Sequence, residues 1–234
     1  QQEMHSTRVA MAQTMENLGI IGSKGYSQLM EWNPFNQNAS ASFFDPEWMF
    51  GVKDGFDVVI GNPPYIRRTS LSEIDKLAYD KLYFSAEKQY DIYLLFIEKG
   101  IKSLQGKGVL CYINPIKFFN ADYGEKCREL IIHNCNIKTI LDVSQLSVFE
   151  KAMTYPCVLL LEKDTLPNNV IDYLYPKTLS DVLNAKSIKK ISFSQKNFAV
   201  KEYLFIIPKN AELEGIITKV DDTQTTISSL FNVA

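Results

Sequence analysis

The feature that most constrains the fold is an apolar run, Phe56–Gly61, which leads directly into Asn62-Pro63-Pro64-Tyr65. The β-branched residues of the run favour a buried strand, and the two prolines prevent the sheet ladder from continuing. In an open α/β sheet, ligands bind outside the carboxyl ends of the strands. We therefore expect the turn at Asn62 to face a binding site rather than the core.

The residues of this turn suit a planar amine. An amide or purine amino group is a poor nucleophile, because its lone pair is delocalised into the carbonyl or the ring. The side-chain oxygen of Asn62 and a main-chain carbonyl aimed by the φ-restricted prolines could accept both amino hydrogens and help to localise that lone pair. Tyr65 adds an aromatic face on which a planar base can stack. A proline-stiffened turn after a core strand, with no chemistry, is the alternative.

Apolar runs and helical patterns alternate after the turn, which predicts a mainly parallel, doubly wound α/β sheet. A buried helix at 90–104 precedes a strand at 108–113, and a helix at 123–135 precedes strands at 137–143 and 155–161. If the last two of these strands pair antiparallel, they form a hairpin near the sheet edge. The remaining predicted elements are helical segments at 6–18, 71–79, 179–184 and 213–220 and a strand at 170–175.

Composition narrows the classes of function. The 234 residues are 46% hydrophobic, enough for one domain with a substantial core. A net charge of −2 argues against a small basic DNA-coating protein, so nucleic-acid binding would need a local basic face or a further domain. Four cysteines without a Cys-x-x-Cys pair, and two histidines, offer no metal-ligand spacing and suit a reducing compartment. Without a long apolar run or a signal-peptide pattern, we expect a cytoplasmic protein without membrane contact.

The strand Phe56–Gly61 and the turn Asn62–Tyr65 resemble the catalytic motif of S-adenosylmethionine-dependent amino-methyltransferases. They are most similar to the DNA adenine methyltransferases of bacterial type II restriction-modification systems. The resemblance covers about Gly55 to Lys163, and the sequence from Tyr203 onward resembles the lead-in to the target recognition domain of the large, type IIG-like single-chain enzymes. It implies a partial Rossmann-like class I methyltransferase fold, with S-adenosyl-L-methionine as cofactor. Double-stranded DNA and a restriction subunit or fused nuclease domain are the implied partners.

The resemblance also implies roles for the residues of the turn. An adenine flipped out of the duplex would be held through its amino group by Asn62 and by the carbonyl of Pro63. Pro64 completes the rigid catalytic turn. The flipped base would be sandwiched between the rings of Tyr65 and Phe149, and Phe149 lies in a polar stretch where an exposed ring needs a reason.

Cofactor and DNA contacts are implied for further residues. Phe96, with Asn62, would contact the cofactor, and its ring would pack against the cofactor's adenine; core packing of Phe96 is an equal alternative. Arg67 and Arg68 follow the turn and could contact DNA phosphates, or they form a solvated charge pair. The most basic stretch, 186–191, is expected to be a solvated face rather than a phosphate contact. No metal site is expected.

One departure from the family concerns the first 54 residues. The family places a glycine-containing cofactor loop before the turn, and residues 1–54 contain no strand, Gly-rich turn and helix in that order. We therefore expect the N-terminal cofactor-binding half to be absent and the fragment to be inactive by itself. The expected organisation is a helix and loop-rich lead-in at 1–54, a catalytic half at 55–163 and a C-terminal extension at 164–234 leading toward an absent target recognition domain.

Two other functions remain open at this point. Related enzymes use the same four residues to methylate a protein glutamine or an RNA guanine, but they are compact and do not need an extension such as 164–234. A non-catalytic DNA-binding subunit that retains a decayed methylase half is the third reading. The sequence therefore favours a DNA adenine methyltransferase.

Overall fold

The computed structural model describes residues 2–19, 26–27, 30, 45–148, 155–184, 188–199 and 201–208. The chain divides into two compact units, Gln1–Lys53 and Asp54–Ala234. The described residues of the first unit include the helices α1 (Gln2–Asn17) and α3 (Pro46–Phe50) and further helical residues at 26–27 and 30, and none of them is in a strand. The helix predicted at 6–18 is therefore confirmed, whereas the helix predicted at 213–220 lies outside the described residues.

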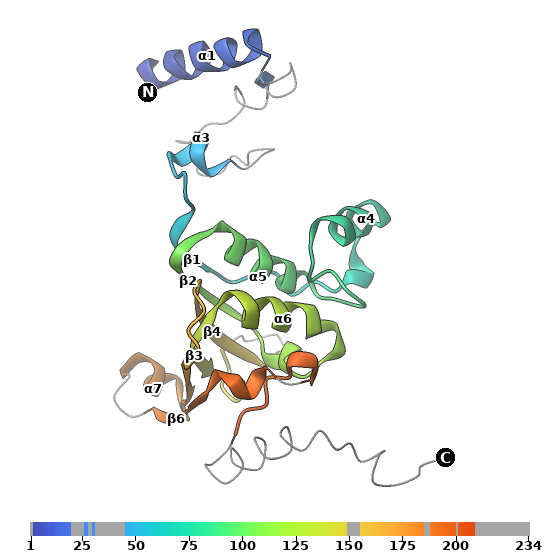
Figure 1. Cartoon of the computed structure of the whole chain (residues 1–234), viewed down its shortest axis with the longest axis vertical. Helices are drawn as coiled ribbons and strands as arrows, with labels where there is room; N and C mark the ends of the chain where they lie inside the picture. The colour runs from blue at the N-terminus through green and yellow to red at the C-terminus, as the bar shows by residue number, and fades with distance from the viewer. Residues whose placement is uncertain are drawn as a thin grey trace. The chain divides into compact units, whose positions relative to one another are not determined.

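The second unit is built on a six-stranded sheet in the order β1-β2-β4-β3-β5-β6 (Figure 1). β1 pairs parallel with β2, and β3 pairs parallel with β5. β4 runs antiparallel between β2 and β3, and β6 runs antiparallel along β5. Among the described strands, β1, β2, β3 and β5 therefore point the same way, which confirms a mainly parallel, Rossmann-like α/β fold. The strands are β1 (Phe56–Gly61), β2 (Leu104–Pro115), β3 (Asn136–Asp142), β4 (Pro156–Glu162), β5 (Val170–Tyr175) and β6 (Lys189–Ser194).

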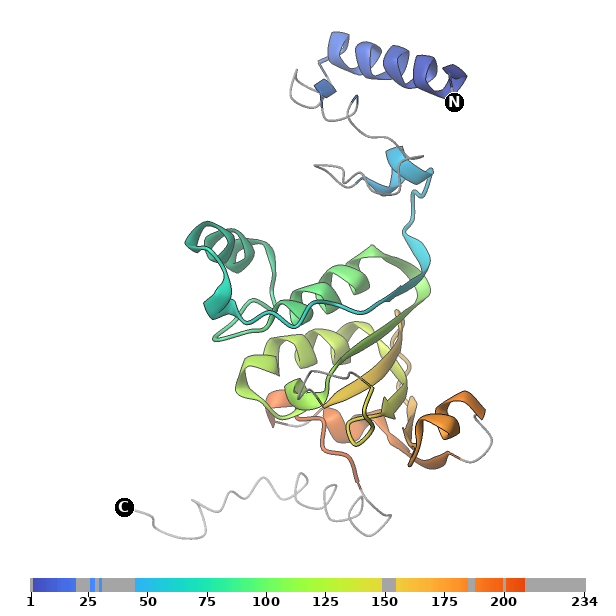
Figure 2. The same ribbon diagram turned by 180° about the vertical axis from the view of Figure 1, so that it is seen from behind.

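The helices α5 (Ile92–Ser103) and α6 (Glu125–Asn134) lie side by side along one face of the sheet, as Figures 1 and 2 show. The core lies between them and the sheet, where large apolar side chains such as Leu110 and Leu159 are fully buried. Each such burial contributes roughly 1.5–3 kcal/mol. The other helical segments are α4 (Glu73–Leu82), α7 (Leu179–Asn184) and single turns at Arg68–Ser70, Ile116–Phe119, Asp122–Gly124, Gln195–Phe198 and Lys201–Tyr203.

The antiparallel pairing predicted for the strands at 137–143 and 155–161 is present, but the pair does not lie at the sheet edge. β3 and β4 pair antiparallel as expected, but β4 also pairs with β2, so Cys157 stands between Asn114 and Asp142 inside the sheet. The antiparallel pair at the sheet edge is formed instead by β5 and β6. β6 was not predicted, because its two exposed lysines suggested a solvated face, while Phe193 of the same strand is buried.

The burial of β1 differs from the prediction of a buried strand. Val59 packs against the core, but the side chains of Val58 and Ile60 are 61% and 77% exposed. Successive side chains of a strand point to opposite faces of the sheet. β1 stands at the end of the described sheet and pairs with β2 alone, and no described segment covers the face that carries Val58 and Ile60.

Gly55 sets the close approach of β1 to the start of β2. It has a φ of +106°, and a Cβ placed on it would lie 2.6 Å from the main-chain nitrogen of Gln105. We expect Gly55→Ala to lower the free energy of unfolding by about 2–4 kcal/mol, because the new methyl group meets backbone and the φ is strained. Urea denaturation of the chain measures this loss. Gly106→Ala is the control, since nothing lies within 4 Å of its Cβ position; an equal loss in both variants would contradict the prediction.

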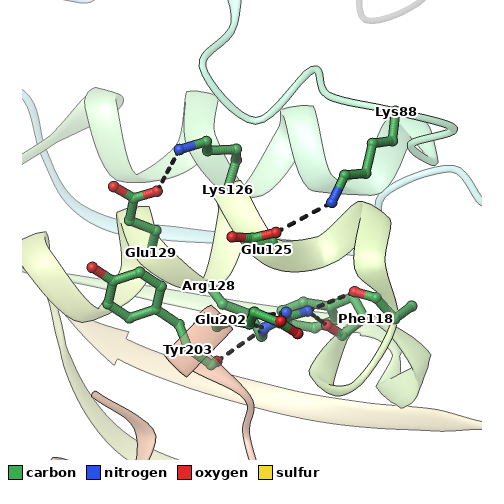
Figure 3. Close-up of polar contacts among 9 residues, drawn as sticks. Lys88, Phe118, Glu125, Lys126, Arg128, Glu129, Glu202 and Tyr203 are labelled. Carbon is green, nitrogen blue, oxygen red and sulfur yellow. Dashed lines mark hydrogen bonds and ion pairs between the residues drawn. The ribbon is translucent and has the colours of Figure 1, made fainter. Parts of the chain in front are cut away.

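The buried guanidinium of Arg128 ties the last described segment to the turn that follows β2 (Figure 3). It donates hydrogen bonds to the carbonyls of Phe118 and Ala121, both 2.7 Å, and to the carbonyls of Glu202 and Tyr203, at 2.8 and 2.9 Å. Burial lowers the pKa of Arg128. Glu202 and Tyr203 have the positive φ values of 63° and 50°. The hydrogen bonds that their carbonyls accept from Arg128 offset the strain of this left-handed backbone.

Candidate functional site

The proline-rich turn follows the carboxyl end of β1, as predicted. Asn62 is exposed, Pro63 is buried and Pro64 is exposed. Within the described part of the chain, the Asn62 carboxamide makes no hydrogen bond or ion pair. A side-chain oxygen and amide on a rigid turn are thereby left accessible to a ligand.

Tyr65 is fixed from two directions. Its hydroxyl donates a 3.3 Å hydrogen bond to the carbonyl of Ile113 in β2, and its ring meets the ring of Tyr93 edge-on, with centroids 6.0 Å apart. Burial, with a smaller contribution from Cys157, raises the pKa of Tyr65 to about 12. The side chain is therefore a neutral phenol whose half-buried ring is held in a defined orientation.

The segment after the turn is joined to the start of α5. The amide of Ile92 donates to the carbonyl of Ile66 at 2.8 Å, and the amide of Arg68 donates to the carbonyl of Tyr90 at 3.0 Å. Helix α5 therefore has a fixed position relative to the turn, although α5 begins about thirty residues later in the chain.

A pocket of about 380 Å³ lies where the turn, α4 and α5 meet. Its walls are Pro64 of the turn, Tyr79 of α4, Tyr83 at the C-cap of α4, and Ile92, Leu95, Phe96 and Lys99 of α5. The Phe96 side chain is 43% exposed. Phe96 is thus a pocket residue rather than a core residue, and the size and apolar lining of the pocket are typical of small-molecule sites.

The two arginines after the turn have acidic neighbours. The guanidinium of Arg68 lies 2.6 Å from a carboxylate oxygen of Asp80 and 5.7 Å from the ring centroid of Tyr90. Its hydrogen bond to Asp80 raises the pKa of Arg68. Arg67 is exposed and forms an isolated antiparallel bridge with Asp91. The second predicted stacking residue, Phe149, lies outside the described residues.

Sequence reasoning missed Asn114, which is fully buried next to the residue that anchors Tyr65. Its amide nitrogen lies 3.6 Å from the sulfur of Cys157, while its side-chain oxygen is buried without a hydrogen-bond partner among the described residues. Such an unsatisfied oxygen is costly. The Asn114-Pro115 pair gave only the signal of a strand end.

Glu98 is a second buried polar residue that the sequence did not reveal. Its carboxylate accepts hydrogen bonds from the amides of Phe84 and Ser85, at 3.1 and 2.7 Å, and from Lys102. Burial alone would raise the pKa of Glu98, but the hydrogen bonds from Lys102 and Ser85 outweigh burial and lower it. Glu98 thus connects α5 to the segment that follows α4.

The depressed pKa of Glu98 predicts a pH-dependent contribution to stability. Because its pKa is lower in the folded than in the unfolded chain, the contribution is complete above the unfolded pKa of roughly 4.3 and is lost as the pH falls through the folded value. We expect Glu98→Gln to destabilise the chain at pH 7 and this difference to shrink toward pH 3. Urea unfolding of both proteins across this range measures it, and a difference independent of pH would contradict the prediction.

Taken together, a mainly parallel α/β sheet with a polar, proline-rigid turn at a strand end beside an apolar pocket defines a class of ligand-binding α/β domain. The chain belongs to the Eco57I restriction-modification methylase family, whose sequence profile matches residues 5–149, more than half of the chain. The family resemblance predicted from the sequence is confirmed.

Curated relatives support this membership. The type II restriction enzyme and methyltransferase RM.Eco57I of Escherichia coli is 36% identical over 116 residues, which are 48% of this chain and 12% of the relative. The type II methyltransferase M.BstVI of Geobacillus stearothermophilus is 29% identical over 126 residues, which are 53% of this chain and 22% of the relative. The chain thus spans less than a quarter of the length of these two relatives.

A solved structure supports the fold. A chain from a type I restriction-modification system has a TM-score of 0.50 and 13% identity, and the match covers 77% of this chain and 45% of that one. No described residues form a cluster of three or more His, Cys, Asp or Glu side chains able to hold a metal ion. Among the described helices, none is long and apolar enough to cross a membrane.

Proposed function

We propose that this chain carries the catalytic turn of a site-specific DNA methyltransferase that methylates the exocyclic N6 amino group of adenine. The observation that carries the proposal is the Asn62 carboxamide, which is exposed on a rigid turn and makes no bond to another described residue. The enzyme would be the modification part of a type II restriction-modification system. Family membership and the relatives that share the sequence support this assignment.

The turn would act on the adenine amino group directly. Target adenine must leave the base stack to reach any protein group, so it would be flipped from the duplex. The side-chain oxygen of Asn62 and the carbonyl of Pro63 would accept the two amino hydrogens and leave the nitrogen lone pair directed for attack. Tyr65 would stack on the base, and its hydrogen bond to Ile113 fixes the stacking plane. Positioning is then the protein's main contribution to the rate.

The pocket beside the turn fits the adenosine part of S-adenosyl-L-methionine. Phe96 offers a partly exposed ring and Pro64 an apolar surface to a planar purine. When bound, this cofactor would supply an activated methyl group. Asn62 stands two residues from Pro64, so the same turn would contribute to both binding events.

The wider organisation is part of the proposal. Double-stranded DNA is the substrate, and a restriction subunit or a fused nuclease domain is the partner. Arg67 suits a DNA phosphate better than Arg68, whose guanidinium is paired with Asp80. Phe149 would supply the second stacking ring. We place the protein in the cytoplasm, where its substrate lies.

We also propose that residues 1–234 are inactive by themselves. The supports are the small share of the relatives' length that the chain spans and the absence of a strand among the described residues before Asp54. Residues 1–54 would be a lead-in, 55–163 the catalytic half and 164–234 an extension toward a target recognition domain. Robust DNA methylation by residues 1–234 alone would contradict this part of the proposal.

The test is methylation by the full-length gene product with cofactor labelled in its methyl group. Genomic DNA, total RNA and ribosome-release proteins are offered separately, and DNA products are digested to nucleosides for mass analysis. Label in N6-methyladenine is expected. Label in RNA or protein alone would favour an RNA guanine or protein glutamine methyltransferase, and DNA binding without any label would favour a non-catalytic subunit.

A further inference from the structure

Helix α4 lies largely at the surface of the second unit. It buries none of its residues, and Ile74, Leu77 and Leu82 of its outer face are 61–80% exposed. Tyr79 of its inner face and Tyr83, the residue that caps its C-terminus, nevertheless line the pocket beside the catalytic turn. Both tyrosines also pack against the hydrophobic core, so this side of α4 holds the helix in position.

Polar contacts hold α4 in place at the pocket side. Asp80 accepts hydrogen bonds from Arg68, at 2.6 Å, and from the hydroxyl of Tyr90, at 3.0 Å. The segment directly after α4 is held by Glu98 of α5 through the amides of residues 84 and 85. Figures 1 and 2 show α4 beside the first turns of α5. Asp80 lies between the two tyrosines in the chain and residues 84 and 85 follow Tyr83, so the two attachments hold the tyrosines opposite α5.

The two tyrosines form a single aromatic surface. Tyr79 lies in the last turn of α4, and Tyr83, four residues later, is the C-cap residue of the helix. Their rings meet edge-on, with centroids 6.2 Å apart at an interplanar angle of 71°. Phe96 and Leu95 line the same pocket from α5. A flat ligand in the pocket would thus meet aromatic rings from two different helices.

We propose that Tyr79 and Tyr83 are ligand-binding residues that hold a planar purine ring in this pocket together with Phe96. The inference rests on the proposed function, because it deepens the assignment of the pocket to the adenosine part of the cofactor. Aromatic stacking against a base contributes about 1–3 kcal/mol by alanine substitution. α4 gives the pocket a second wall that the catalytic turn and α5 do not supply.

The test measures binding of S-adenosylhomocysteine and of adenosine to the full-length protein by calorimetry, without reference to turnover. Tyr79→Ala and Tyr83→Ala are each expected to raise the Kd for both ligands by about tenfold. Tyr79→Phe and Tyr83→Phe keep the ring and should bind within about twofold of wild type. Tyr83→Leu keeps apolar volume without the ring and should resemble the alanine variant.

Leu77→Ala is the matched control, since Leu77 lies on the same helix, is 61% exposed and does not line the pocket; its Kd should not change. Melting temperatures without ligand identify any variant that is simply less folded. Wild-type affinity in both tyrosine-to-alanine variants, with weaker binding in Phe96→Ala, would overturn this inference and leave the proposed function intact. A wild-type protein that binds neither ligand would overturn the proposed function and this inference with it.

Discussion

Asn62→Ala in the full-length protein is expected to lower the rate of DNA methylation by about 10²–10³-fold, the effect of removing one well-placed polar group from a reacting centre. The free energy of unfolding should stay within about 0.5 kcal/mol of wild type, because the Asn62 side chain is exposed and makes no bond to another described residue. Initial rates at saturating DNA and cofactor measure the first quantity, and urea unfolding measures the second.

Two further variants separate the role of the carboxamide from a general surface effect. Asn62→Asp keeps side-chain oxygen acceptors and should retain more activity than Asn62→Ala. Asn168→Ala removes an exposed carboxamide from the loop between β4 and β5 and should leave the rate unchanged. The affinity for S-adenosylhomocysteine should change much less than the rate in Asn62→Ala. A rate for this variant within about threefold of wild type would contradict the role of Asn62.

The turn could be predicted from the sequence because its groups are adjacent in the chain. Once Phe56–Gly61 forms a strand, the peptide bonds themselves bring Asn62 and Tyr65 to its carboxyl end, whatever the rest of the fold does. The strands at β2, β3, β4 and β5 were predictable for a related reason. Each is a short apolar run bounded by residues that stop a strand or a helix.

The order of the strands depends on pairing between distant segments, which no local pattern specifies. The insertion of β4 between β2 and β3 places Cys157 beside both Asn114 and Asp142. The exposure of Ile60 likewise depends on which segments cover its face of β1 rather than on the composition of the strand. Hydrophobic patterning states which residues prefer burial, but tertiary structure decides whether a covering layer is present.

In the candidate site, too, local sequence predicts the turn, whereas tertiary contacts decide which other residues surround it. Phe96 lies on α5, whereas Tyr83 caps α4. Their common pocket depends on Glu98, which holds the segment after α4, and on Asp80, which joins α4 to Arg68 and Tyr90. A charged residue in an amphipathic pattern is normally read as exposed, so the burial of Glu98 could not be predicted. Asn114 gave no signal either, because its importance comes from its neighbours in space.

The burial and the partners of Arg128 could not be predicted from the sequence. Its acceptors are main-chain carbonyls, which every residue has. Its guanidinium makes five hydrogen bonds, to Phe118, Ala121, Glu202 and Tyr203. Phe205, beyond the last of these, stacks on Phe198 with ring centroids 4.5 Å apart. The arginine thus holds a segment that is distant in sequence against the turn after β2.

Arg128→Met is therefore expected to lower the free energy of unfolding by about 3–5 kcal/mol, because methionine fills much of the space but leaves several buried carbonyls without donors. Urea unfolding measures the loss. Amide hydrogen exchange should also accelerate at Phe205, whose amide donates to the carbonyl of Phe119 at 3.1 Å.

Lys88→Met is the control that tests whether removing any positively charged side chain lowers the free energy of unfolding as much as Arg128→Met does. Lys88 pairs with Glu125 at 3.2 Å, but its side chain is 47% exposed (Figure 3). Exposed ion pairs contribute about 1 kcal/mol or less, so this variant should stay close to wild type. Arg128→Lys should fall between the two, because an ammonium group has fewer donors and cannot reach four carbonyls at once. Equal stabilities for Arg128→Met and Lys88→Met would show that the carbonyls around Arg128 find other donors, and that the last segment does not depend on the arginine for its position.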